Sequence, residues 1–235
     1  ARFTKALGLY ALAPAVLYAA APAFTDLLIY FCGLFVLLCV YGKKKLLFGS
    51  ASALIVLSLP VFYLLLSWER WKSLFAFLNP EANADSGGYM TLLSQKAIQS
   101  GGLWGRGFGI SPDGLPFSSS DLFYAYLVSN LGWVFGIAVV LTALLFAARL
   151  AFMTARLRDG YARGLVAGLS AVLCFQLMWN LLMCVGLLPI VGMKLPILNW
   201  SSGTILELAA VGLILGAYRR KDMSGTPYLR QASRV

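Results

Sequence analysis

Six apolar runs, most of them near 20 residues long, constrain the fold of this chain more than any other feature. An α-helix rises about 1.5 Å per residue, so a run of about 20 residues crosses a hydrocarbon core of about 30 Å. The sequence therefore predicts an all-α fold, a polytopic membrane helix bundle of about six transmembrane helices. The predicted spans lie near residues 6–24, 27–42, 46–67, 122–147, 165–184 and 203–218 of a membrane domain 1–221, which a tail 222–235 follows.

The composition supports this interpretation and excludes several classes of enzyme. Only 12% of the residues are charged, about half the supply of an ordinary soluble domain. The chain has no histidine, which excludes Ser-His-Asp and Cys-His catalysis and histidine-ligated zinc. The four cysteines lie inside apolar runs without close C-x-x-C spacing, so we interpret them as small apolar side chains and predict no metal site.

The distribution of Lys and Arg predicts the orientation in the membrane, because short cytoplasmic loops collect these residues. If the chain starts inside, fourteen of its 19 Lys and Arg residues are cytoplasmic, and both termini are cytoplasmic. The remaining five are then outside: Arg70, Lys72, Lys96, Arg106 and Lys194. The basic residues are scattered over four segments, which argues against nucleic acid as a partner and suits anionic membrane lipid.

The outer segment 68–120 is the longest connection between runs, and loops of this length are usually functional or disordered. Its aromatic residues suit a membrane interface, and residues 89–98 show a short helical pattern. We therefore expect a long structured outer loop. Six of the nine acidic residues are predicted on or near the outer face, so chemistry is expected there.

A glycine-rich stretch, Ser100–Gly109, follows the short helical pattern of this loop. Gly101, Gly102, Gly105 and Gly107 surround Leu103, Trp104 and Arg106. Glycine lets backbone N–H groups approach a ligand closely, so the stretch either cradles an anionic group with the help of Arg106 or only makes turns.

Asp121 follows three serines at the outer mouth of the fourth run. It is either an N-cap of the helix, a general base facing an outer cavity, or both. In the fifth run Gln176 and Asn180 share one helical face, and either hydrogen-bond between helices or contact substrate. Glu207 lies inside the sixth run, where we expect a functional carboxylate or a structural ion pair with a cation such as Lys194.

Several ordered motifs together resemble the outer loop and last spans of the SEDS family (shape, elongation, division and sporulation; FtsW, RodA and SpoVE type). They are Phe77-Leu78-Asn79-Pro80, Gly88-Tyr89, the glycine-rich stretch, Leu115-Pro116, Ser120-Asp121-Leu122-Phe123, Leu131-Gly132, Gln176, Asn180, Gly186-Leu187-Leu188-Pro189, Gly192 and Leu195-Pro196. The family usually has His-Thr before the aspartate, where this chain has Ser119 and Ser120, and acidic residues where it has Ser129 and Asn130. The family has about ten spans, so the chain resembles the C-terminal majority of a divergent member.

The resemblance implies a peptidoglycan glycosyltransferase, an inverting enzyme that polymerises lipid II at the outer face of the bacterial plasma membrane. It also implies a class B penicillin-binding protein as transpeptidase partner, and a role in division, elongation or sporulation. The family's essential aspartate corresponds to Asp121, the predicted base. Arg106, Lys96 and Lys194, or a divalent cation, would offset the pyrophosphate charge, and Gly101, Gly102, Gly105, Gly107, Gln176 and Asn180 are the other predicted substrate contacts.

Three alternatives stay open. A different lipid-linked glycopolymer enzyme, such as an O-antigen ligase or polymerase, would share the outer-face chemistry but is not expected to show these particular motifs. A flippase or transporter of lipid-linked precursors would place polar groups near mid-membrane on broken helices, and Gln176, Asn180 and Glu207 are compatible with this. A non-catalytic SEDS-like scaffold would keep a partner surface but lose its site, and the altered neighbours of Asp121 are compatible with that.

The predicted topology can be tested with cysteines placed at Ser86 and Ser233 after the four native cysteines are removed. Because segment 68–120 is predicted outside and the tail inside, a membrane-impermeant thiol reagent should label position 86 and not position 233 in intact cells. Labelling of position 233 alone would reverse the predicted orientation.

Overall fold

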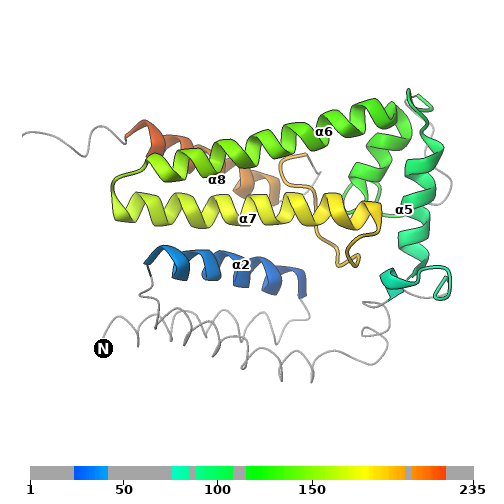
Figure 1. Ribbon diagram of the computed structural model, residues 1–235, viewed down its shortest axis with the longest axis horizontal. Coiled ribbons are helices and arrows are strands. Elements are labelled where there is room, and N and C mark those ends of the chain that lie inside the picture. Colours follow the sequence, from blue (N-terminus) through cyan, green and yellow to red (C-terminus); the bar gives the residue numbers. More distant parts are fainter. Residues whose placement is uncertain (1–23, 42–75, 85–87, 108–114, 199–202, 221–235) are drawn as a thin grey trace, which may run out of the picture.

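In the computed structural model, residues 24–41, 76–84, 88–107, 115–198 and 203–220 are described, and every regular element in these ranges is a helix (Figure 1). The elements are α2 (Phe24–Tyr41), the 3-10 helix η1 (Ala76–Leu78), α5 (Gly88–Ser100), α6 (Phe123–Arg156), α7 (Gly160–Val185) and α8 (Gly203–Arg219). The predicted all-α class is confirmed. The predicted spans near 6–24 and 46–67 and the tail 222–235 lie outside the described residues.

Helix α7 is the centre of the bundle, because α2, α5, α6 and α8 all pack against it. Figure 1 shows α6 and α7 side by side along the long axis, with α5 across the end where α6 begins and α7 ends. Small residues bring α2 close to α7: a Cβ on Gly33 would lie 3.1 Å from Val172, and one on Gly168 would lie 3.3 Å from Leu37. Such close approach is typical of helix pairs in membranes.

Two of the described helices, α6 and α7, are long and apolar enough to cross a membrane, and α2 contains a shorter apolar stretch, Thr25–Val40. In α6 the mean hydropathy of the most apolar window is 2.4, and only 17% of that window is buried inside the protein. An unburied apolar surface of this kind is stable against lipid chains rather than water.

The ends of α6 and α7 differ from the predicted runs for local reasons. Helix α6 continues to Arg156, past the apolar limit near residue 147, because a helix does not need to end where its apolar face ends. Helix α7 begins at Gly160 rather than near 165, because the Asp159 carboxylate accepts a hydrogen bond from the Ala162 N–H at 2.9 Å and caps the helix.

Helix α6 is interrupted at Gly132, whose backbone has φ 85° and ψ 173°. The interruption leaves helical N–H and C=O groups without partners inside α6, and the glycine-rich stretch supplies them. The N–H groups of Arg106 and Gly107 donate to the carbonyls of Ser129 and Asn130, at 3.1 Å each. In return, Trp133 and Val134 donate to the carbonyls of Gly102 and Leu103, at 2.9 and 3.4 Å.

This exchange explains why glycines are needed on both sides of the contact. A Cβ on Gly105 would lie 2.0 Å from the Asn130 carbonyl oxygen, and one on Gly132 would lie 2.2 Å from the Leu103 carbonyl oxygen. Both residues also have positive φ, 81° and 85°, which only glycine adopts without cost. The backbone of the outer loop is thereby joined directly to the backbone of α6.

Gly105→Ala should therefore destabilise the protein by about 2 kcal/mol or more, because the new Cβ overlaps backbone that cannot move aside and φ is positive. Gly160→Ala is the matched control, since a Cβ there meets nothing within 4 Å and should change stability by less than about 0.5 kcal/mol. Thermal unfolding of the two purified variants in detergent measures the difference, and equal stabilities would disprove the backbone contact.

Candidate active site

Asp121 lies in the turn that precedes α6, at the end of the bundle where α5 crosses α7. The N-cap of α6 is Leu122, and no side chain caps this helix end. The N-cap interpretation of Asp121 is therefore wrong. Its carboxylate instead faces the loop after α7, where a Cβ on Gly192 would lie 3.5 Å from Asp121 Oδ2. Gly192 has φ 78°, a conformation that favours glycine, and its lack of a Cβ keeps the space next to the carboxylate free of a side chain from this residue.

The electrostatic environment of Asp121 suits a base. The side chain is partly buried, and burial raises the pKa of the carboxyl above its ordinary value of 3.8, because the charged form loses solvation. A hydrogen bond from the Ser120 side chain and the positive charge of Lys194 lower this pKa and partly oppose burial. A carboxylate with a raised pKa accepts a proton more readily than an ordinary one.

Asn180 holds the backbone of Asp121 in place. It is fully buried, and its Nδ2 group donates to the carbonyls of Asp121 at 2.9 Å and of Met193 at 2.7 Å. Both amide protons are thus used on backbone oxygens of two different segments. Asn180 was predicted as a substrate contact, but the structure gives it a positioning role and no surface open to a ligand.

The loop from Gly186 to Leu198 contains Met193, which Asn180 binds, and other helices anchor the loop on both sides of Met193. Gly186 ends α7 in a left-handed conformation, φ 88°. The Thr25 hydroxyl of α2 donates to the Val191 carbonyl, and the Ile197 N–H donates to Glu207 Oε2 of α8 at 2.7 Å. Glu207 therefore binds a backbone N–H, and the expected ion pair with Lys194 is not its described contact.

The glycine-rich stretch, predicted either to cradle an anion or to make turns, uses several of its backbone amides inside the protein. The N–H groups of Gly101, Gly105 and Gly107 donate to protein carbonyls, those of Ile98, Gly101 and Asn130. These three amides therefore have acceptors within the protein, and an anion cradle formed by the stretch stays a prediction. Gly102 has a positive φ of 57° and its carbonyl accepts from Trp133, so the stretch builds the turn that fills the α6 interruption.

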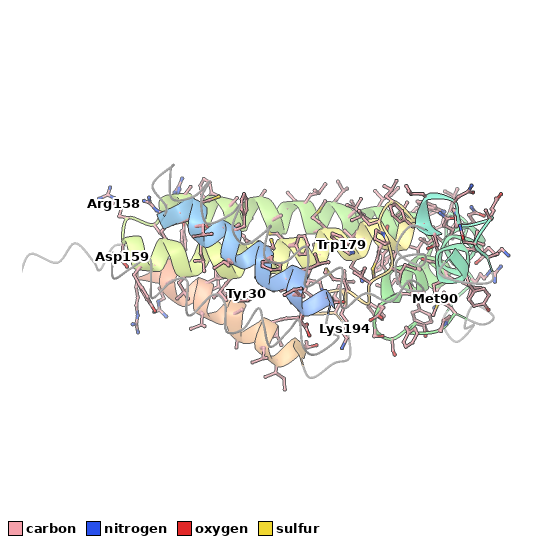
Figure 2. All side chains as sticks on the ribbon, turned by 90° about the horizontal axis from the view of Figure 1, so that it is seen from below. Tyr30, Met90, Arg158, Asp159, Trp179 and Lys194 are labelled. Atoms are coloured by element: carbon pink, nitrogen blue, oxygen red, sulfur yellow. The ribbon has the colours of Figure 1, made fainter. Side chains whose placement is uncertain are left out.

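The three predicted cations, Lys96, Arg106 and Lys194, are all exposed but differ in their relation to Asp121. Lys194 acts on the Asp121 charge, and Figure 2 shows it beside the end of α2. Arg106 Nε donates to the Ser100 carbonyl at 3.1 Å. Within the described ranges, neither Arg106 nor Lys96 shows an effect on the Asp121 charge.

Gln176 lines a cavity of about 690 Å³ between α2, α7 and α8. The walls are mostly apolar, and Asp26 and Glu207 line the cavity as well. Gln176 Oε1 is buried and has no hydrogen-bond partner among the described residues. One end of the cavity lies close to the Asp121 region. Asp26 lines the cavity, and the hydroxyl of its neighbour Thr25 donates to the Val191 carbonyl. The residue after Val191 is Gly192, which faces the Asp121 carboxylate.

No group of three or more His, Cys, Asp or Glu side chains lies together in the described part of the chain. Among the described residues, Asp121 is therefore not part of a cluster of three or more such side chains that could hold a divalent cation. Ser120, Thr25 and the anchoring role of Glu207 were not predicted. A serine before the aspartate was visible in the sequence, but the contacts of Thr25 and Glu207 join segments that only the fold brings together.

Comparison with known proteins agrees with the resemblance in the sequence. The chain matches the FTSW_RODA_SPOVE family, described as cell cycle protein, over residues 1–222. It is 31% identical over 219 residues to the peptidoglycan glycosyltransferase MrdB of Escherichia coli strain K12, covering 89% of this chain and 58% of that protein. It is 30% identical over 154 residues to stage V sporulation protein E of Bacillus subtilis strain 168, covering 64% of this chain and 42% of that protein.

The fold also matches a chain in a solved structure of a peptidoglycan synthase complex. That structure concerns the structural coordination of polymerization and crosslinking by the complex. The TM-score is 0.72 at 23% identity, covering 92% of this chain and 61% of the matched chain. The chain thus spans less than two thirds of the length of these relatives. The motifs around Asp121, the helical bundle and the match over residues 1–222 agree, and the chain belongs to the FtsW, RodA and SpoVE family.

Proposed function

We propose that the protein polymerises lipid II into peptidoglycan glycan strands at the outer face of the plasma membrane, with Asp121 as the general base. The observation that carries this proposal is the environment of Asp121: a partly desolvated carboxylate beside Lys194 and Gly192, held through its own backbone by Asn180. The relatives named as peptidoglycan glycosyltransferases support it.

The reaction needs one base. The Asp121 carboxylate accepts the proton of the acceptor hydroxyl as that oxygen attacks the anomeric carbon of the donor sugar. The new bond is C–O, the broken bond joins the anomeric carbon to the pyrophosphate oxygen, and the pyrophosphate leaves with the bonding electron pair. Attack opposite the leaving group inverts the configuration at that carbon. Since pyrophosphate is a good leaving group, a second carboxylic acid of the glycosidase kind is unnecessary.

Two further features support a lipid-linked substrate. Lys194 supplies positive charge where the pyrophosphate would develop negative charge. The apolar cavity between α2, α7 and α8 offers space for a lipid chain beside the site. We also propose a multi-pass protein with both termini cytoplasmic, and a class B penicillin-binding protein as partner. The solved complex of similar fold concerns polymerization and crosslinking together.

The flippase alternative is less well supported by the contacts of the residues it needs. Asn180 and Glu207 bind backbone groups of the loop after α7. The α6 interruption is closed by the glycine-rich stretch and is not left open to a path through the bundle. Of the three polar residues, Gln176 alone keeps a buried atom without a described partner. A non-catalytic scaffold is separated from an enzyme by the following experiment.

Asp121→Asn should lower glycan polymerisation by about 10²–10⁴-fold, because the amide cannot accept the proton and general base catalysis contributes this factor. Gel analysis of glycan chains made from lipid II by the purified full-length protein with its partner measures the loss. Glu81→Gln is the matched control, since it removes an exposed carboxylate of the outer segment that neither acts on Asp121 nor lines the cavity. Full activity in Asp121→Asn would eliminate Asp121 as the base, whereas the absence of polymerisation by the unaltered protein would leave the scaffold alternative.

Lys194→Gln should move the acid limb of the polymerisation rate to higher pH. Lys194 lowers the pKa of Asp121, so its removal lets burial raise that pKa further. The base works only when ionised, and the rate should therefore begin to fall at a higher pH than in the unaltered protein. Lys96→Gln, which removes an exposed cation of α5 that has no described effect on Asp121, should leave the limb in place. An unmoved limb in Lys194→Gln would disprove this coupling.

A further inference from the structure

A second cavity, of about 520 Å³, lies between α2, α6 and α7. Its walls are apolar and built largely from small side chains, including Val36, Val40, Ala151, Ala167 and Ala171. It lies toward the α6–α7 turn and involves neither Asp121 nor the loop after α7. Figure 2 shows Arg158 and Asp159 of that turn at the opposite end of the bundle from Met90 of α5.

The cavity contains one polar group that the protein leaves unused. Ser170 of α7 lines the cavity and is 6% exposed, and its hydroxyl has no hydrogen-bond partner within the described part of the chain. A buried hydroxyl without a partner costs free energy, and such a group usually marks a missing acceptor. Thr154, by comparison, also lines the cavity, but its hydroxyl donates to the Leu150 carbonyl at 2.8 Å.

Arg163 lines the same cavity at the start of α7. Its Nε and one Nη2 proton donate to the Leu157 carbonyl, at 2.9 and 2.5 Å, which fixes the guanidinium beside the turn. A guanidinium has five N–H donors, so further donors remain for an anion. Arg163 precedes Ser170 by seven residues, which is about two helical turns, so the two side chains lie on the same face of α7.

The surrounding charge is strongly positive. Arg149, Arg156 and Arg158 lie on α6 or in the turn, within fourteen residues of Arg163 in the sequence. The one acidic residue of this segment, Asp159, is engaged as the N-cap of α7. The guanidinium of Arg156 lies 4.0 Å from the ring of Phe152, and Arg156 does not line the cavity.

We propose that this cavity binds an anionic diacyl phospholipid. One acyl chain occupies the apolar space between α2, α6 and α7, the phosphate binds Arg163, and an ester carbonyl accepts the hydrogen bond of Ser170. The order of the two polar groups, with Arg163 nearer the start of α7 than Ser170, corresponds to a headgroup at the membrane surface followed by ester groups at the edge of the hydrocarbon core. Basic pockets between membrane helices bind anionic lipid in this way. The site is independent of the polymerisation proposed for Asp121.

The test is native mass spectrometry of the full-length protein, released from micelles that contain equal amounts of phosphatidylglycerol and phosphatidylcholine with identical acyl chains. The protein should retain phosphatidylglycerol preferentially. Arg163→Gln should reduce this retention by about fivefold, the effect of one cation near an anionic headgroup, whereas Arg163→Lys should preserve most of it. Arg156→Gln removes the same charge outside the cavity and should leave retention unchanged.

A second pair of variants tests the acyl chain. Ala147 lines the cavity, whereas its neighbour Ala148 is exposed and does not. Ala147→Phe should exclude the lipid, and Ala148→Phe should not. Equal retention of the two lipids, equal losses in Arg156→Gln and Arg163→Gln, or full retention in Ala147→Phe would each overturn the proposal. Displacement of the bound lipid by millimolar glycerol phosphate would also overturn it, because the site would then select a free phosphate.

Discussion

The hydrogen-bond exchange between the glycine-rich stretch and the interruption of α6 is the constraint on which the Asp121 end of the bundle depends. A helix that breaks near a membrane must satisfy its freed N–H and C=O groups within the protein, since lipid offers no partners. Here the backbone at residues 102–107 accepts from and donates to the backbone at residues 129–134. The contact permits no side chain at Gly105 or Gly132. It fixes the short first part of α6, and therefore the turn that carries Asp121.

A second layer of bonds joins that turn to the rest of the bundle through α7. Asn180 is the shared member, because a single buried amide group binds the Asp121 carbonyl and the Met193 carbonyl. Thr25 of α2 and Glu207 of α8 hold the same loop from two other helices. Residues of α2, α7, α8 and the turn before α6 thus hold the loop after α7 and the carboxylate-bearing turn together. A base needs this kind of support, because proton transfer requires the carboxylate and the acceptor hydroxyl to stay within hydrogen-bond reach.

The sequence predicted the elements whose signals are local and missed those that depend on distant contacts. Apolar run length was sufficient to predict α2, α6, α7 and α8, and the short helical pattern at 89–98 was sufficient for α5. The interruption at Gly132 was not predicted, because a single glycine in an apolar run is compatible with an unbroken helix. For the glycine-rich stretch, an anion cradle and simple turns were both predicted, because composition cannot reveal which acceptors the backbone amides bind. Likewise, Asn180 and Glu207 were correctly noticed as unusual polar residues, but their backbone partners lie ten or more residues away and are visible only in the fold.

The departures from the family pattern next to Asp121 also have a physical reading. Where the family usually has threonine before the aspartate, this chain has Ser120, which keeps a hydroxyl at the same position. That hydroxyl hydrogen-bonds the Asp121 carboxylate and lowers its pKa, as the charge of Lys194 does, while burial raises it. For the base proposed at this position, burial would increase the affinity for the proton, and the two opposing contacts would favour the ionised form. Serine supplies the hydroxyl that makes one of these contacts. The replacements at Ser129 and Asn130 are different, since their side-chain polar atoms are buried without partners in the described part of the chain, and they affect the α6 interruption rather than the base.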